Sequence, residues 1–321
     1  MGKLIGIGEA LIDFLPKQIG VNLKAVEEFK RVAGGAPANV CACVRRLGTE
    51  SVILTKLGTD AFGDYLIDTL NEVGVNTNYV KRTNAANTAL AFVSLKKDGN
   101  RDFSFYRNPS ADMLLEASEI EADLFKSGDI LHFCSVDLVD APIRQAHDQA
   151  LKYAKENELL ISFDPNVRLP LWSDHDEYKR IINKYINYAD ILKISDEEFA
   201  FITGESFSEE RVLKLFRGNV KVIIYTEGAK GARVYTRKNT YQFPGFKVKA
   251  IDTTGAGDSF IGAFLYQLLK MKLTLNNLET TDYTQIIKFA NAVGAIVASR
   301  EGAIPAMPKE SEVEEFIKNN Q

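Results

Sequence analysis

The sequence predicts an α/β protein, a three-layer α/β/α sandwich with a mostly parallel central sheet and a small β-sheet lid. Two observations carry this prediction. Short β-rich segments alternate with helix-length segments whose apolar residues recur every three to four positions, an order typical of βαβ units. Several β-rich segments are continuous apolar runs, as expected for strands that helices cover on both faces.

The expected strands of the central sheet are Lys3–Gly8, Ser51–Thr55, Ile130–Phe133, Leu159–Phe163, Ile191–Ile194 and Val220–Tyr225. Two further stretches, Phe14–Val32 and Thr88–Tyr106, look extended and do not fit a crossover helix. Within the second, Lys96–Asn100 has the composition of a hairpin turn. We expect these stretches, about residues 14–32 and 88–108, to form a small separate sheet that acts as a lid.

Residues 1–321 are expected to form a single domain, because no repeat, low-complexity tract or Ser/Pro-rich linker divides them. The net charge of −4 comes from 43 acidic and 39 basic residues scattered along the chain, which argues against nucleic acid as a partner. Glu9 and Asp13 interrupt the apolar N-terminal stretch, so neither a signal peptide nor a membrane span is predicted. Three cysteines, an odd number, suit a reducing compartment, and we expect a cytoplasmic protein.

The strongest chemical signal is the segment Asp252–Phe260, DTTGAGDSF, which leads into an apolar run of helical period. Its small residues let the backbone N–H groups of Gly255, Ala256 and Gly257 converge at a helix N-terminus, which favours an anion such as phosphate. Asp258 would then lie beside this anion hole, where a carboxylate can take the proton of an attacking hydroxyl. The alternative is that the glycines only form a turn and Asp258 only caps the helix.

Together with Gly34–Asn39, GGAPAN, this segment resembles the two signatures of the PfkB-type, ribokinase-like carbohydrate kinases. The resemblance extends from Ile5 to about Pro308. It implies an ATP-dependent kinase that phosphorylates a hydroxyl of a small sugar, folded as a sandwich with a lid. In that family the second signature supplies the anion hole and the catalytic base, which correspond here to residues 255–257 and Asp258.

The resemblance also implies a sugar site. A carboxylate that accepts two hydrogen bonds can clamp adjacent sugar hydroxyls, and a glycine pair lets the backbone approach a sugar ring closely. The expected substrate contacts are Asp13, Gly34, Gly35, Asn39, Phe105, Arg107 and Arg168. The stretch Phe105–Asp112 and the segment Asp164–Arg168 look like those of bacterial and plant fructokinases, so D-fructose is the expected substrate. 2-Keto-3-deoxygluconate, ribose and nucleosides are the alternative substrates. The aromatic side chains of this stretch could instead serve only in packing.

The nucleotide and metal contacts are likewise implied by the resemblance. The expected ATP contacts are Lys193, Ser195, Thr226, Gly228, Gly231 and Asn291. Glu198 would bind Mg²⁺ through water, although Ser195 stands where the family more often has asparagine. Asp252 and Thr254, with carbonyls between about residues 298 and 303, resemble a monovalent-cation loop, for which K⁺ is the expected ion. By themselves, residues 193–198 also fit an acidic first helical turn and residues 226–231 a hairpin turn.

Other classes of function remain as alternatives. Gly6 and Gly8 mimic the start of a dinucleotide fingerprint, but Leu11 stands at the third glycine position, which argues against a nicotinamide dehydrogenase. A non-catalytic regulatory homologue is opposed by the intact Gly-Ala-Gly-Asp sequence. The sequence has no P-loop and no protein-kinase motif, and its three histidines are isolated, so no transition-metal site is expected. An apolar lid face would favour a homodimer.

Overall fold

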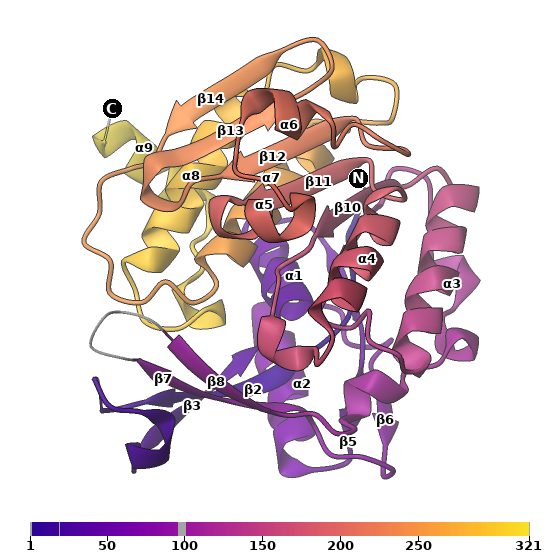
Figure 1. The fold of residues 1–321 in the computed structure, drawn as a ribbon, viewed down its shortest axis with the longest axis vertical. Coiled ribbons are helices and arrows are strands. Elements are labelled where there is room, and N and C mark those ends of the chain that lie inside the picture. The colour runs from indigo at the N-terminus through magenta and orange to yellow at the C-terminus, as the bar shows by residue number, and fades with distance from the viewer. Residues whose placement is uncertain (1, 19, 96–100, 321) are drawn as a thin grey trace.

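The computed structural model describes residues 2–18, 20–95 and 101–320. Its main feature is an eight-stranded sheet in the order β14-β13-β12-β11-β10-β9-β1-β4 (Figure 1). The parallel strands are β1 (Leu4–Ile7), β4 (Ser51–Leu54), β9 (Ile130–Cys134), β10 (Leu160–Asp164), β11 (Ile191–Ser195) and β12 (Val222–Thr226). They confirm the six expected strands. Two antiparallel strands that the sequence analysis missed, β13 (Gly231–Tyr235) and β14 (Thr240–Pro244), extend one edge.

Helices cover both faces of this sheet, so the predicted three-layer sandwich is confirmed (Figure 1). Leu4 of β1 lies in one hydrophobic core and its neighbour Ile5 lies in the other, because successive side chains of a strand point to opposite faces. The first core is completed by α1 (Ala36–Arg46), α2 (Ala61–Val73), α7 (Ala256–Lys270), α8 (Thr284–Ala298) and α9 (Glu310–Asn319). The second is completed by α3 (Pro142–Glu156), α4 (His175–Ile186), α5 (Asp196–Thr203) and α6 (Glu209–Leu213).

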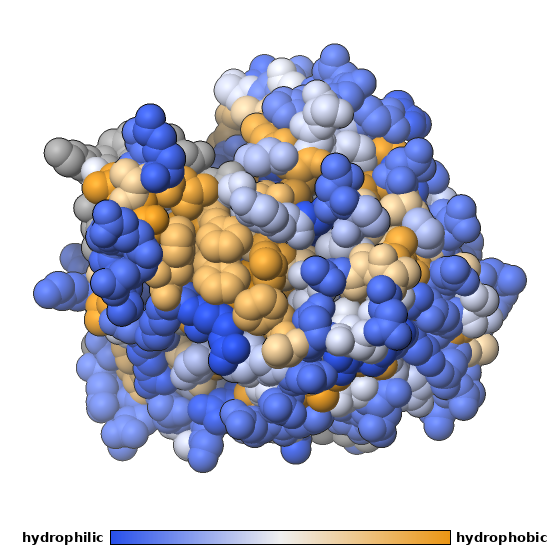
Figure 2. Space-filling model, turned by 90° about the horizontal axis from the view of Figure 1, so that it is seen from below, coloured by the Kyte–Doolittle hydropathy of each residue, from blue (hydrophilic) through white to orange (hydrophobic). Residues whose placement is uncertain are grey.

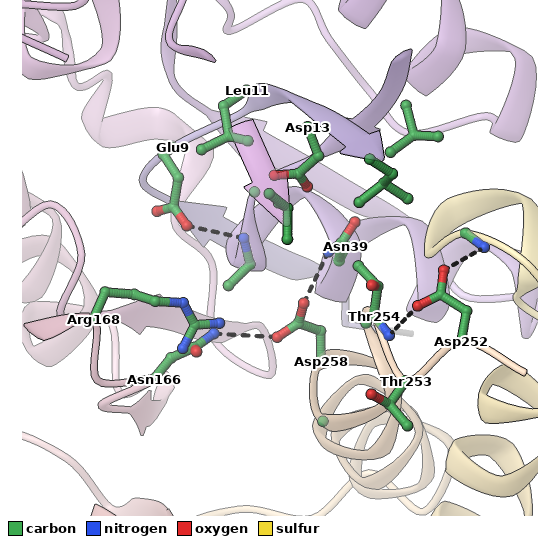
Figure 3. Close-up of a pocket in the computed structure, with 18 of the residues that line it drawn as sticks. Glu9, Leu11, Asp13, Asn39, Asn166, Arg168, Asp252, Thr253, Thr254 and Asp258 are labelled. Carbon is green, nitrogen blue, oxygen red and sulfur yellow. Dashed lines mark hydrogen bonds between the residues drawn. The ribbon is translucent and has the colours of Figure 1, made fainter. Parts of the chain in front are cut away.

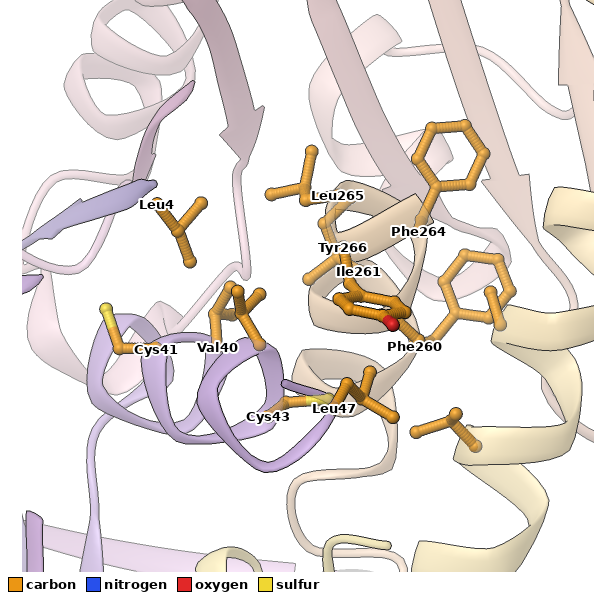
Figure 4. Packing of buried hydrophobic residues seen from close by; sticks show 14 of the residues in the cluster. Leu4, Val40, Cys41, Cys43, Leu47, Phe260, Ile261, Phe264, Leu265 and Tyr266 are labelled. Carbon is orange, nitrogen blue, oxygen red and sulfur yellow. The ribbon is translucent and has the colours of Figure 1, made fainter. Parts of the chain in front are cut away.

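Close packing of α1 against α7 brings two distant parts of the sequence together (Figure 4). A side chain at Gly262 would place its Cβ 2.8 Å from the Cβ of Cys43, so glycine at this position allows the close approach. The Cys43 thiol also donates a hydrogen bond to the carbonyl oxygen of Ser259 at 3.3 Å. As a result, the first turn of α7 lies beside the first turn of α1.

The small separate sheet has the order β3-β2-β7-β8. Its strands are β2 (Leu11–Pro16), β3 (Phe29–Gly34), β7 (Leu90–Leu95) and β8 (Arg101–Tyr106). The first strand therefore starts at Leu11, earlier than the expected residue 14, because Gly8, at φ 139°, turns the chain out of the central sheet after β1. The expected hairpin turn at 96–100 lies outside the described residues. A minor two-stranded sheet pairs β5 (Lys56–Gly58) with β6 (Lys81–Thr83).

No helix within residues 2–18, 20–95 and 101–320 is both long and apolar enough to cross a membrane.

Candidate active site

A pocket of about 730 Å³ lies between the small sheet and the carboxyl ends of the central strands (Figure 3). Ligands of open α/β sheets bind at this edge. The small sheet contributes one wall, with the aliphatic side chains of Leu11, Val32 and Val93, the ring of Phe105 and the carboxylate of Asp13. The opposite wall comes from the starts of α1 and α7, the loop after β10 and strand β11, and includes Asn39, Asn166, Arg168, Lys193, Gly255, Gly257 and Asp258.

Asp258 is the third residue of α7, and two amides hold its carboxylate (Figure 3). Asn39 Nδ2 donates to Oδ2 at 2.8 Å, and Asn166 Nδ2 donates to Oδ1 at 3.2 Å. Burial raises the pKa of Asp258 above its ordinary value, while the bond from Asn39 and the charges of Arg168 and Lys193 act in the opposite direction. The result is an oriented carboxylate that is more basic than an exposed aspartate, as a general base requires.

The glycine-rich turn before Asp258 leads directly into α7, which begins at Ala256. Gly255 adopts φ 75°, and a side chain there would place its Cβ 2.6 Å from the Cβ of Ala303. The Ala256 N–H closes the turn on the carbonyl oxygen of Thr253 at 3.2 Å. Gly257 follows in the first helical turn, where N–H groups have no acceptor within the helix. Lys193 adds positive charge, because its Nζ lies 3.9 Å from where a Cβ on Gly257 would be. The turn can therefore receive an anion.

Lys193 is held by a buried ion pair, with Nζ 2.6 Å from Oδ2 of Asp164. Burial raises the pKa of Asp164 to about 6, although the charge of Lys193 opposes this. Burial alone would lower the pKa of Lys193, but the charges of Asp164 and Glu198 raise it overall. Lys193 is therefore a permanent cation at the floor of the pocket.

Ser195 and Glu198 form the capping box of α5 and do not line the pocket. The N–H and Oγ of Ser195 each lie 2.9 Å from Glu198 Oε2, and the Val167 N–H donates to Oε1 at 2.6 Å. Protein donors thus engage both carboxylate oxygens of Glu198. Because both oxygens already accept hydrogen bonds, Glu198 suits a Mg²⁺ ion that is held through water rather than by direct coordination.

The predicted sugar contacts divide into two groups. Asp13 lies in the middle of β2, opposite Val32 of β3, and faces the pocket with Phe105 and Arg168. A side chain at Gly34 would collide with the Asp13 carboxylate, and one at Gly35 with the backbone of Glu9, so both glycines are required for this close packing.

Arg107, by contrast, does not line the pocket. Its guanidinium is buried and pairs with the carboxylates of Asp112 and Asp137.

The predicted nucleotide contacts beyond Lys193 also lie outside this pocket. Thr226 ends β12 and Gly231 begins β13, with Gly228 between them, so these residues form the hairpin turn that the sequence also allowed. Asn291 of α8 donates from Nδ2 to the carbonyl oxygens of Phe243 and Pro244, at 2.9 and 3.2 Å. In this structure its amide joins α8 to strand β14.

The expected cation loop is a compact arrangement of two segments. Asp252 accepts hydrogen bonds from the N–H groups of Thr254 at 2.9 Å and Gly302 at 3.0 Å. The Ile251 N–H donates to the carbonyl oxygen of Ala298 at 2.8 Å. Residues 251–254 therefore lie against residues 298–302, with oxygen atoms of the kind that a monovalent cation prefers.

Among the pocket residues that the sequence analysis did not assign to the site are Asn166 and Glu9. Asn166, which contacts Asp258, adopts φ 47°, and only its place two residues before Arg168 could have drawn attention to it. Glu9 was noted only as a charge within an apolar stretch. It lines the pocket and is almost fully buried, and burial raises its pKa to about 7 against the opposing charge of Arg107.

A family model described as pfkB family carbohydrate kinase matches residues 1–310. The chain belongs to this family. As a PfkB carbohydrate kinase it is an ATP-dependent sugar kinase, and this membership opposes the dehydrogenase alternative. Among its relatives is the probable fructokinase-5 of Arabidopsis thaliana, 45% identical over 98% of this chain and 97% of the relative.

Solved structures agree with this assignment. A fructokinase with bound ATP from Xylella fastidiosa superposes with a TM-score of 0.89 at 34% identity, covering 99% of this chain and 98% of the other. A fructokinase double mutant from Vibrio cholerae O395, in a form with fructose, ADP and potassium ion bound, gives a TM-score of 0.88 at 32% identity over the same shares. The expected small-sugar kinase fold is confirmed.

Proposed function

We propose that this PfkB kinase transfers the γ-phosphoryl group of ATP to D-fructose and releases fructose 6-phosphate and ADP. The observation that carries the proposal is the position of the Asp258 carboxylate, which lies in one pocket with Asp13 and with the glycine-rich start of α7. The choice of fructose is supported by the fructokinase relatives and by the fructose-bound Vibrio cholerae structure.

In the proposed mechanism, Asp13 and Asn39 hold the sugar against the small sheet, with its 6-hydroxyl directed at Asp258. Asp258 removes the hydroxyl proton as the oxygen attacks the γ-phosphorus, and the bond to the bridging oxygen of ADP breaks. Within the anion hole at residues 255–257, the N–H groups of Gly255 and Gly257, together with the charge of Lys193, stabilise the transferring phosphoryl group. The small sheet acts as the lid of a single kinase domain, and its closure excludes water, which would otherwise compete as acceptor.

The proposal includes two ions. Mg²⁺ supplies charge neutralisation at the phosphates and would be held by them and by water, with Glu198 in the outer sphere. In the described parts of the chain, no group of three or more His, Cys, Asp or Glu side chains could hold a metal ion. A monovalent cation, K⁺, would occupy the loop of Asp252 and Thr254 beside the anion hole, in line with the potassium-bound relative.

We also propose a homodimer that forms through the small sheet. On the sheet face opposite the pocket, the rings of Phe14 and Phe92 stack with centroids 4.6 Å apart, and Phe29 packs against Phe92. Tyr106, beside them, is 62% exposed. Figure 2 shows a hydrophobic patch on this side of the molecule. A second copy of the sheet would cover it.

We also propose that the protein is located in the reducing cytoplasm. The described cysteines are free and buried, which suits that compartment.

A coupled assay of ADP release tests the substrate. Mg-ATP is supplied with D-fructose, 2-keto-3-deoxygluconate, ribose, glucose or adenosine, each at the same concentration. Fructose should give the highest kcat/KM, and NMR of the product should place the phosphate on the 6-hydroxyl. Preference for another acceptor would overturn the choice of fructose. A folded, ATP-binding protein with no turnover on any acceptor would favour the regulatory alternative.

A further inference from the structure

A buried group of charged residues adjoins the pocket, which one of them, Glu9, also lines. Glu9 follows β1, Arg107 follows β8 and Asp137 follows β9, and the fourth residue is Asp112. None of the four is more than 8% exposed. Arg107 pairs with the carboxylates of Asp112 and Asp137, and its charge acts on Glu9 without a direct contact between the two side chains.

Glu9 differs from the other two carboxylates because it contacts a helix. Its Oε1 accepts a hydrogen bond at 2.9 Å from the N–H of Ala36, the first residue of α1 (Figure 3). This N–H has no acceptor within the helix, and the positive end of the helix dipole favours an acidic partner. Glu9 Oε2 is buried and has no hydrogen-bond partner in the described parts of the chain. The glutamate thus joins the chain just after β1 to the start of α1.

The start of α1 in turn fixes the amide that holds Asp258. Asn39 lies one turn after Ala36, and its N–H donates to the carbonyl oxygen of Gly35 at 2.9 Å. Gly35, at φ 102°, packs so tightly against the Glu9 backbone that a Cβ there would collide with it. A shift of this turn would therefore move Asn39 Nδ2 away from Asp258 Oδ2, which it contacts at 2.8 Å.

We propose that Glu9 is a positioning residue, which anchors α1 through Ala36 and thereby holds the Asn39 amide in place against Asp258. This inference rests on the proposed role of Asp258 as the base. Arg107 acts one step further away, through the charge that it presents to Glu9. The arrangement also gives a function to the buried arginine that the sequence had suggested as a sugar contact.

The test is a double-mutant cycle on the full chain, with D-fructose and Mg-ATP. Glu9→Ala should lower kcat about tenfold to a hundredfold, the range that a small misplacement of reacting groups produces, with a smaller rise in KM for fructose, which Asn39 also contacts in the proposed mechanism. Glu9→Gln should recover most of the turnover, because its amide oxygen can still accept from the Ala36 N–H. Asn39→Ala should lower kcat similarly, and the double variant should be no slower than Asn39→Ala alone.

The pH profile of kcat distinguishes this role from a merely structural one. The hydrogen bond from Asn39 lowers the pKa of Asp258, so its weakening in Glu9→Ala should move the acid limb of the profile to higher pH. Additive losses in the cycle would overturn the proposal, as would a raised KM for fructose with unchanged kcat and acid limb, which would mark Glu9 as a direct sugar contact.

Folding and the identity of the base are controlled separately. If circular dichroism shows that Glu9→Ala does not fold, Glu9→Asp tests the same contact, because it keeps the carboxylate but is one methylene too short to reach Ala36. Asp258→Asn provides the other control. Normal turnover of Asp258→Asn would refute the proposed role of Asp258 as the base. An inactive Asp258→Asn together with a fully active Glu9→Ala would refute only the proposed role of Glu9.

Discussion

Asn39 and Asp258 are 219 residues apart in sequence, yet the Nδ2 of the first lies 2.8 Å from Oδ2 of the second. The contact joins the two glycine-rich segments of the chain, each at the start of a helix, and it exists because α1 packs closely on α7. It orients the carboxylate that the proposed chemistry uses.

The stability of the protein should depend on the charge of Glu9. Burial raises the pKa of Glu9 to about 7 from an ordinary 4.5, so the folded state holds this proton more tightly than the unfolded state. The resulting stabilisation is complete below pH 4.5 and disappears as the pH rises through 7. It amounts to roughly 3 kcal/mol at 1.36 kcal/mol per pKa unit.

Glu9→Gln cannot ionise, and it isolates this effect from the other buried acids. Urea unfolding of both proteins at several values of pH should show that the stability of the wild type falls more steeply between pH 4.5 and 7. Parallel pH dependences of the two proteins would contradict the prediction.

Loss of the Lys193 cation should affect both stability and turnover. Lys193→Met leaves Asp164 buried without its partner, which typically costs about 3–5 kcal/mol. The double variant Lys193→Met with Asp164→Asn should regain much of the free energy of unfolding, because no buried charge is left unpaired. It should not regain kcat, since the positive charge near Gly257 is still absent. Full recovery of activity would argue against a role of Lys193 in phosphoryl transfer.

Gly255 should tolerate no side chain. Gly255→Ala would force a left-handed backbone on alanine and press its Cβ against Ala303, at a cost of about 1–3 kcal/mol for the backbone alone. Gly257→Ala is the matched control, because its Cβ would meet only Lys193 Nζ, at an ordinary 3.9 Å. Urea unfolding should show a loss for the first variant and none for the second. Equal stabilities would mean that the turn does not require glycine at 255.

The proposed dimer should depend on the aromatic face of the small sheet. Phe92→Lys places a charge within the cluster of Phe14, Phe29 and Tyr106, so sedimentation equilibrium should show a dimer for the wild type and a monomer for the variant. Lys152→Glu, on the exposed face of α3, is the charge-changing control and should stay dimeric. A monomeric wild type at working concentration would refute the dimer.

Much of the fold could be predicted because several central strands are continuous apolar runs, such as β1 and most of β12, as expected for a parallel sheet that is buried on both faces. The antiparallel edge was missed. In β14, Tyr241 and Phe243 alternate with more exposed residues, which is a weak pattern in a short strand that ends in Pro244. The boundary between the two sheets depended on the backbone of Gly8, which composition does not reveal.

The parts of the site that could be predicted were those within short motifs, namely the turn at 255–257 and the carboxylate that follows it. Side-chain direction could not be predicted. Arg107 turns away from the pocket because Asp137, distant in sequence, offers it a buried partner, and Asn291 is engaged by the carbonyl oxygens of β14. The direction of such a side chain depends on neighbours that are distant in sequence. The motif alone is therefore compatible with a ligand contact and with a structural contact.

The most direct test of the central claim is kcat of Asp258→Asn with Mg-ATP and D-fructose. The substitution keeps the size of the side chain and one acceptor oxygen, so one of the two hydrogen bonds from the amides of Asn39 and Asn166 can remain, but it removes the proton acceptor. We predict a folded protein with a normal melting temperature whose kcat is lowered about a hundredfold to ten-thousandfold. A folded variant with near-normal kcat would show that Asp258 is not the base and would contradict the account.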